Sequence, residues 1–171
     1  MKKLIRKNTR RPFPYFEFIP HITFINRSFT ISKRFKFTES AIYYFNDDDQ
    51  FDVNKLFGFS VGMHHNNSFR FGWRPNKELN KIEIVGYEYH DKIRIPIIPI
   101  CEVELNRWYT YSIKYSSSLK RVDYIVNDDF YNFFGSGDEI NLKHKINFGY
   151  RLGLYFGGNK KAPHNMVIYR E

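Results

Sequence analysis

The sequence predicts an all-β protein, an antiparallel β-sandwich of two sheets. Alternation of apolar and polar residues with a period of two dominates the chain, and no segment shows a convincing helical period. The 10 glycines and 7 prolines fall mostly between the apolar runs, where turns are expected. Aromatic residues make up 19% of the chain, and their large rings suit pleated strands better than helices. Many strands separated by short turns are typical of a sandwich or a barrel.

Three segments show the alternation most clearly. Their apolar faces are, in chain order, Phe29, Ile31, Phe35 and Phe37; Tyr109, Tyr111, Ile113 and Tyr115; and Ile146, Phe148, Tyr150, Leu152, Leu154 and Phe156. Lys33 interrupts the first of these faces once. Each pattern predicts a strand with one buried and one solvated face. We expect further strands near residues 40–46, 55–63, 67–74, 81–89, 92–100, 121–127 and 164–170.

The N-terminal segment differs in composition from the rest of the chain. Residues 1–11 contain six cations and no acid, and these supply +6 of the formal net charge of +9. Residues 12–20 contain three prolines and four aromatic residues. Like charges repel and cannot be buried without partner anions. We therefore predict that residues 1–20 form a docking arm on another protein subunit and that residues 21–171 form the sandwich domain.

The predicted docking residues are Lys2, Lys3, Arg6, Lys7, Arg10, Arg11, Phe13, Tyr15 and Phe16. In this hypothesis the aromatic side chains supply affinity, and the cations set the salt dependence of association. Nucleic acid is a second possible partner of the arm, and a solvated tail that aids solubility is the alternative.

The sequence also predicts the compartment in which the chain is made. No apolar stretch follows the basic start, so a signal peptide is not expected, and no apolar run is long enough to predict a membrane-spanning helix. The single cysteine, Cys101, cannot form an internal disulfide. These features predict synthesis in the reducing cytoplasm and no membrane insertion.

Residues from about 22 to 171 resemble the concanavalin A-like lectin/glucanase superfamily. The resemblance rests on the early strand Ser28–Phe37, on the hairpin of Trp108–Tyr115 and Val122–Asn127, and on the Gly157–Gly158 corner before the closing strand. It implies a two-sheet jelly roll. The superfamily contains lectins, glycoside hydrolases, polysaccharide lyases and virion proteins, so the fold does not decide the function.

The hydrolase motif of this superfamily is not found in the sequence. It would place paired carboxylates as Glu-x-Asp-x-x-Glu on one strand. The acidic pairs that come nearest are Glu83 with Glu88 and Glu102 with Glu104, and neither matches.

Polysaccharide lyases of this fold use an arginine, a histidine or glutamine, and a tyrosine on one sheet. Arg70, His64 or His65, and Tyr155 could be arranged in this way, but no lyase motif surrounds them. We therefore expect no catalytic residues and a chain that is not an enzyme.

Two segments are candidates for binding a glycan. His64-His65-Asn66-Asn67 is the densest polar cluster, and its alternative interpretation is a polar hairpin tip. Trp73 lies two residues from Phe71 and next to Arg74, and an exposed indole there could stack on a sugar ring; core packing is the alternative. The candidate glycan-binding residues are Trp73, His64, His65, Asn67 and Arg70.

Two loops could hold an ion, and we assign a metal or a cofactor to neither. The segment Asn46–Asp52 carries four carboxylates, which could bind calcium or could simply be solvated. The segment Gly157–His164 resembles a phosphate-binding loop only superficially, because no helix follows it. A sandwich corner with positive backbone dihedrals explains its two glycines.

Three hypotheses for the function remain. The first is a non-catalytic structural and binding module of a large assembly, a bacteriophage virion component with a lectin-like fold. The second is a carbohydrate-binding lectin-like module. The third is a polysaccharide lyase or glycoside hydrolase, which we rank last because such an enzyme is normally exported and no export segment is evident. We expect incorporation into a virion after cytoplasmic synthesis.

Overall fold

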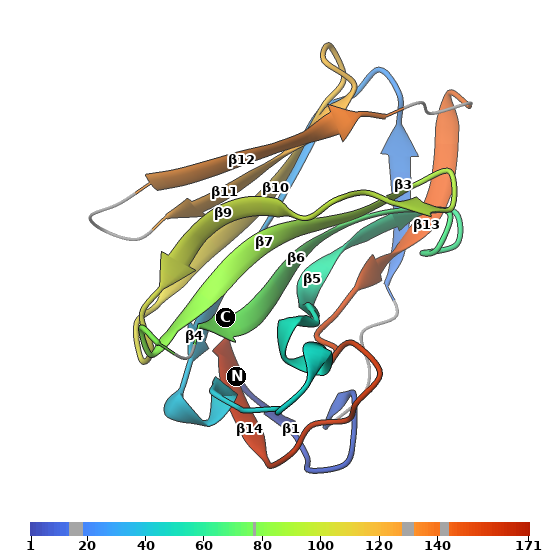
Figure 1. Cartoon of the computed structure of the whole chain (residues 1–171). Helices are drawn as coiled ribbons and strands as arrows, with labels where there is room; N and C mark the ends of the chain where they lie inside the picture. The colour runs from blue at the N-terminus through green and yellow to red at the C-terminus, as the bar shows by residue number, and fades with distance from the viewer. Residues whose placement is uncertain (14–18, 77, 128–131, 141–143) are drawn as a thin grey trace.

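The computed structural model describes residues 1–13, 19–76, 78–127, 132–140 and 144–171. The described residues form two antiparallel sheets packed face to face, which confirms the predicted sandwich (Figure 1). The helical elements among them are two 3-10 helices, η1 (Glu39–Ala41) and η2 (Asp48–Phe51). No helix in this part of the chain has the length and hydrophobicity that would let it span a membrane.

The first sheet has the strand order β12-β11-β10-β4-β14-β1-β2. Its strands are β1 (Lys2–Ile5), β2 (Pro12–Phe13), β4 (Phe29–Phe37), β10 (Tyr109–Ser116), β11 (Arg121–Asn127), β12 (Asn132–Glu139) and β14 (Met166–Arg170).

The second sheet has the order β3-β13-β5-β6-β7-β8, and β9 also pairs with β7. Its strands are β3 (Pro20–Phe24), β5 (Asn54–Val61), β6 (Asn67–Asn76), β7 (Lys81–His90), β8 (Ile93–Arg94), β9 (Ile98–Val103) and β13 (Ile146–Leu152). The C-terminal strand β14 pairs with the early strand β4.

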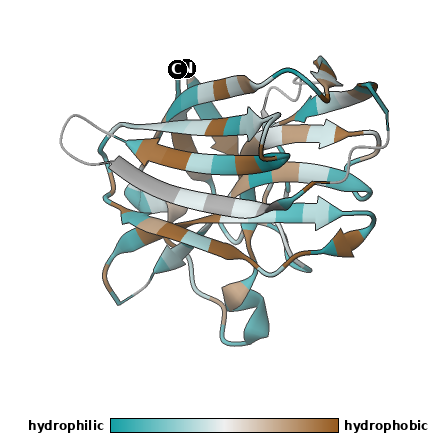
Figure 2. Ribbon diagram, turned by 90° about the horizontal axis from the view of Figure 1, so that it is seen from above, coloured by the Kyte–Doolittle hydropathy of each residue, from teal (hydrophilic) through white to brown (hydrophobic). Residues whose placement is uncertain are grey.

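Aromatic rings fill the space between the two sheets. Phe71 on β6 contacts Tyr111 on β10 and Tyr124 on β11, with ring centroids 5.4 and 5.1 Å apart, so one ring ties together strands of both sheets. Phe35 stacks on Phe57 of the opposite sheet, with ring centroids 5.6 Å apart. Hydrophobic and hydrophilic residues are interspersed along the strands, as expected when one face of each strand is buried (Figure 2).

The N-terminal residues are part of the sandwich, which corrects the predicted boundary between arm and domain. Strand β1 lies between β14 and the short edge strand β2 of the first sheet, and Ile5 is fully buried (0% exposed). The two chain ends lie side by side in both views (Figures 1 and 2), and the Arg170 amide donates to the Met1 carbonyl over 2.8 Å. Alternation explains the burial, because it turns Lys3 and Ile5 inward and Lys2 outward. The predicted docking residue Lys3 is therefore buried in the sandwich (5% exposed). Of the predicted docking residues, Tyr15 and Phe16 lie outside the described residues.

At its N-terminal end, strand β13 buries the face opposite to the predicted one. The predicted buried face began with Ile146 and Phe148, but these side chains are 50% and 71% exposed. Asn147 is buried instead, and the chain leaves the strand after Leu152. Both faces of this segment contain large residues, and a shift of one residue exchanges the faces, so the pattern alone could not select the inner one.

Candidate functional site

The register of the second sheet places a set of polar and aromatic side chains on its outer surface. Arg70 on β6 lies between Gly58 on β5 and Tyr87 on β7, and Ser68 pairs with Tyr89. Since Phe69 and Phe71 point into the core, the alternate residues on β6 face outward. We call this surface the basic aromatic face; it consists of Lys55, His64, Ser68, Arg70, Tyr87, Tyr89 and Tyr150. The strands β13, β5, β6 and β7 that carry it run side by side in Figure 1.

Arg70 lies at the centre of the basic aromatic face. Its side chain is only 8% exposed, and its Nε has no hydrogen-bond partner among the described residues. The hydroxyl of Ser68, two residues away on the same side of the strand, is also buried and has no partner in the described part of the chain. Burial lowers the pKa of Arg70, and the nearby Tyr87 and Tyr150 oppose this effect. A guanidinium donor without a partner is suited to bind an anionic oxygen, because a buried donor is costly to leave unpaired.

Lys55 adds a second cation to this face. Its ammonium donates to the Val53 carbonyl over 2.7 Å and lies 4.3 Å from the centroid of the Tyr87 ring. Burial, and then the charge of Arg70, lower the pKa of Lys55 to about 8. Gly157 leaves the space that Lys55 needs, because a Cβ there would lie 2.8 Å from Nζ and 2.2 Å from the Val53 carbonyl oxygen.

His64 and Tyr150 form a hydrogen-bonded pair next to the cations. The tyrosine hydroxyl contacts Nδ1 of the imidazole, and the His64 amide donates to the same oxygen over 3.4 Å. Burial, then the charges of Arg70, His65 and Arg11, lower the pKa of His64, so its ring is neutral at neutral pH. A neutral imidazole can accept the proton of the tyrosine hydroxyl at Nδ1.

The structure brings together some of the predicted glycan-binding residues and separates others. His64, His65 and Arg70 lie on the basic aromatic face or at its border, where His65 packs edge-on against Tyr89. Asn67 is occupied elsewhere, because its side-chain oxygen accepts a hydrogen bond from the Asp91 amide over 3.0 Å.

Trp73 is not a glycan-binding residue. It is fully buried (0% exposed), and its ring packs on Phe37 of the opposite sheet with centroids 5.2 Å apart. Alternation accounts for this position, because Trp73 shares the inner face of β6 with Phe69 and Phe71. An indole in the core cannot stack on a sugar ring.

Several residues of the face were missed in the sequence analysis. Tyr150, and not the expected Tyr155, contacts His64. Tyr155 instead forms an isolated bridge with Lys55. The available signal was the spacing Ser68-x-Arg70 and Tyr87-x-Tyr89, which puts two polar or aromatic residues on one side of each of two paired strands.

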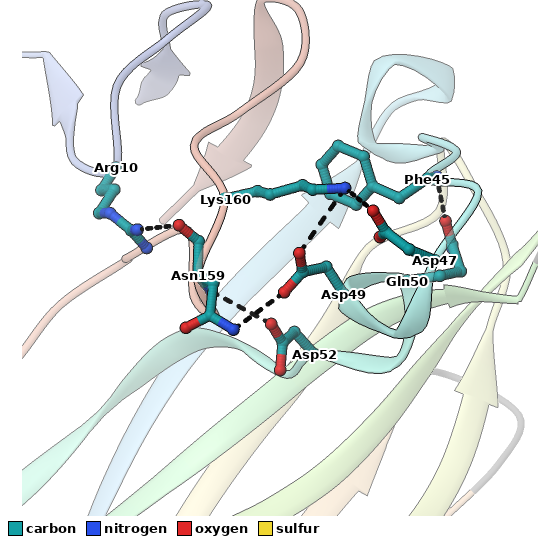
Figure 3. A network of polar contacts seen from close by, with 8 residues as sticks. All are labelled: Arg10, Phe45, Asp47, Asp49, Gln50, Asp52, Asn159 and Lys160. Carbon is teal, nitrogen blue, oxygen red and sulfur yellow. Dashed lines mark hydrogen bonds and ion pairs between the residues drawn. The ribbon is translucent and has the colours of Figure 1, made fainter.

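The acidic segment Asn46–Asp52 is held by hydrogen bonds and an ion pair against the glycine-rich segment Gly157–His164 (Figure 3). The ammonium of Lys160 is ion-paired with Asp47 and lies 3.6 Å from Asp49. The side-chain nitrogen of Asn159 donates to the Asp49 carboxylate, and its backbone amide donates to the Asp52 carboxylate, each over 3.2 Å. Lys160 therefore pairs with two of the four carboxylates that were considered for calcium. Within the described residues, no group of three or more His, Cys, Asp or Glu could hold a metal ion.

The N-terminal segment borders the basic aromatic face. The guanidinium of Arg10 donates to the Asn159 carbonyl over 2.7 Å (Figure 3). It also donates to the Gly158 carbonyl and lies 6.0 Å from the ring centroid of Tyr155. The Phe156 amide donates to the Arg10 carbonyl over 2.7 Å. Part of the positive charge that was predicted to dock on a partner thus lies against the second sheet.

No protein-family model matches this chain, and no curated protein matches its sequence. Its structure is similar to that of alginate lyase vAL-1 from a Chlorella virus, with a TM-score of 0.60 and 13% identity over 99% of this chain and 81% of the lyase. A winged bean acidic lectin in complex with methyl-α-D-galactose aligns with a TM-score of 0.46 and 14% identity, over 86% of this chain and 72% of the lectin. A heptameric pentraxin from Limulus polyphemus aligns with the same TM-score and identity, over 99% of this chain and 75% of the pentraxin. The likeness to the lyase shows that the chain has a jelly-roll β-sandwich fold, in agreement with its two antiparallel sheets.

Proposed function

We propose that this chain binds a polysaccharide of uronic acid units on the basic aromatic face and cleaves it by β-elimination. The observation that carries the proposal is the buried Arg70, whose Nε lacks a partner in the described structure and which lies among Lys55 and three tyrosines. A sugar carboxylate supplies the oxygens that this guanidinium and the Ser68 hydroxyl can bind. The proposal departs from the sequence-based expectation of a non-catalytic module.

The chemistry follows from the side chains present. Arg70 and Lys55 neutralise the uronate carboxylate, which makes the proton on the neighbouring C5 easier to remove. Tyr150 passes its hydroxyl proton to His64 and takes the C5 proton. The electrons of the C5–H bond form a C4=C5 double bond, and the C4–O4 bond breaks. The leaving O4 receives a proton from the Tyr150–His64 pair, so no external reductant, oxidant or water is consumed.

The likeness to the viral alginate lyase supports the proposal in a limited way. At 13% identity the similarity concerns the fold. Alginate is a polymer of uronic acids, and its carboxylates match the cations of the basic aromatic face. The support for the activity therefore comes from the side chains of the basic aromatic face and not from the alignment.

The test is incubation of the purified chain with alginate, polyglucuronate and a neutral glucan. We expect the ultraviolet absorbance of an unsaturated uronate product with one of the two acidic polymers and none with the neutral polymer. Arg70→Ala should abolish product formation, whereas Arg34→Ala serves as a matched control because Arg34 is exposed on the other sheet and pairs with Glu171. Binding of both acidic polymers without any product would leave a lectin-like module as the function. Absence of both binding and product would refute the proposal.

A further inference from the structure

The outer surface of β3 and β13 is apolar where a solvated face would normally be polar. Its residues are Ile22 and Phe24 on β3 and Ile146 and Phe148 on β13, which we call the apolar strip. Phe148 pairs with Ile22, and Ile146 pairs with Phe24. Ile22, Ile146 and Phe148 are 46%, 50% and 71% exposed.

The inner surface of the same two strands is polar. His21, Thr23 and Asn147 are buried. The hydroxyl of Thr23 is hydrogen-bonded to Nε2 of His21 over 3.0 Å, and Asn147 donates to the His144 carbonyl over 2.7 Å. This strand pair therefore buries polar groups that need partners and exposes apolar groups that would be more stable inside. An exposed apolar cluster of this kind marks a binding surface.

The apolar strip is continuous with the basic aromatic face. Tyr150 follows Phe148 on the same side of β13, so the two side chains are about 6.7 Å apart along the strand. The turn after β5 also lies beside the strip, because the Gly62 amide donates to the Phe148 carbonyl over 2.6 Å. A linear ligand that occupies Arg70 and Tyr150 can thus continue across Phe148.

The charges around the strip favour an anionic ligand. Strands β3 and β13 contain no acidic residue. The guanidinium of Arg27 lies 5.1 Å from the ring centroid of Phe24 at the far end of the strip, and Arg70 and Lys55 lie beyond the near end. A chain with apolar sugar-ring faces and regularly spaced carboxylates fits a strip of exposed rings with cations at both ends.

We propose that the apolar strip is a distal subsite that holds further sugar units of the same anionic polysaccharide, with Phe148 stacking against a ring face. This inference rests on the proposed function. The strip makes the chain selective for long polymers, because short oligosaccharides that fill only the basic aromatic face do not reach Phe148. Phe148 is then a specificity residue and takes no part in the proton transfer.

The experiment compares kcat and KM for uronate oligosaccharides of increasing length. We expect KM of the wild type to fall severalfold with length, and we expect Phe148→Ala to remove this decrease while kcat and the KM of the shortest cleaved oligosaccharide stay unchanged. Leu119→Ala is the matched control, because Leu119 is also exposed but lies in the turn between β10 and β11. Phe148 is largely exposed, so its replacement should not impair folding, and circular dichroism of the variant checks this.

Two results would overturn the inference. The first is a wild type that cleaves uronate chains while Phe148→Ala keeps the same length dependence; the proposed function would then stand without the subsite. The second is a wild type that self-associates in sedimentation velocity and a Phe148→Ala variant that is monomeric, again with unchanged length dependence. The strip would then be a contact between copies of this chain. A wild type that neither binds nor cleaves uronate chains of any length refutes the proposed function and the subsite together.

Discussion

The hydroxyl of Tyr150 is hydrogen-bonded to Nδ1 of His64, although 86 residues separate them in the sequence. Tyr150 is on β13, and His64 is in the turn between β5 and β6. Burial, and then the charge of the neighbouring Arg70, lower the pKa of His64 and favour the neutral form of its imidazole. A cation that can bind a carboxylate thus lies next to a pair that can move a proton, which is the combination that β-elimination requires.

Tyr150→Phe should lower kcat on a uronate polymer by about a hundredfold or more, which is the usual contribution of a positioned acid–base group. KM should change little, because the ring remains and only the hydroxyl is lost. The measurement is steady-state kinetics with the unsaturated product as readout. Tyr169→Phe, on β14 of the other sheet, is the control. An unchanged kcat in Tyr150→Phe would show that another group transfers the proton.

Arg70→Met should abolish binding of the polymer and leave the thermal midpoint of unfolding unchanged or higher. The guanidinium is buried, which lowers its pKa, and its Nε has no partner within the described residues, so a methionine of similar length removes an unfavourable burial. Calorimetric titration and thermal denaturation measure the two effects. Arg70→Lys should not restore binding, because an ammonium lacks the planar fork of donors. A large loss of stability in Arg70→Met would argue that Arg70 has a structural role.

Affinity for the polymer should fall as the pH rises through about 8. Burial lowers the pKa of Lys55 to about 8, so its charge is lost above that pH and the attraction to a carboxylate weakens. The effect of Lys55 on stability has the opposite sign. Between a pH of about 8 and the ordinary lysine pKa of 10.5, the unfolded chain binds more protons than the folded chain. Lys55 therefore increases the free energy of unfolding as the pH rises through this range. Titrations at several pH values check the first effect. In Lys55→Met the affinity should be lower and its step near pH 8 absent; a step that persists would assign the titration to another group.

Acid should destabilise the protein partly through His21. Burial and the charge of Arg151 lower the pKa of His21 to about 4 from an ordinary value of 6.5. The unfolded chain therefore binds a proton more readily, and the stability contributed by neutral His21 is lost as the pH falls from about 6.5 to about 4. Urea unfolding across this range should show a weaker pH dependence for His21→Leu than for the wild type, with the exposed His144→Asn as control. Equal pH dependence in His21→Leu and wild type would refute this assignment.

Ile5→Ala should lower the free energy of unfolding by about 2–4 kcal/mol, the usual cost of deleting a large buried aliphatic side chain. Ile5 is fully buried on β1, next to the C-terminal strand. Lys2→Ala, which changes an exposed residue of the same strand, should have little effect. Urea unfolding measures both. Full stability in Ile5→Ala would restore the interpretation of the N-terminus as a separate arm; docking of this segment on another subunit, and a place in a virion, stay predictions.

The two-sheet sandwich and most of its core can be predicted from the residue pattern alone. Residues such as Phe35, Tyr111 and Ile113 lie inside as their alternation predicts, because a strand has only two faces and one of them must be buried. Alternation also contained the information that Trp73 shares a face with Phe71. It could not show which face of Ile146–Leu152 is buried, because large side chains occupy both and the choice depends on polar partners such as Thr23 for His21.

The assembly of the site, in contrast, depends on contacts between distant parts of the chain. Lys55, Arg70, Tyr87 and Tyr150 come from four strands, and their proximity depends on the pairing order of β13, β5, β6 and β7. The pairing of β1 with β14 likewise joins the two ends of the chain. Strand order and register are set by packing between distant segments, which local residue patterns do not encode. The sequence therefore predicts which residues each strand can present outward, and the long-range pairing determines which of them meet.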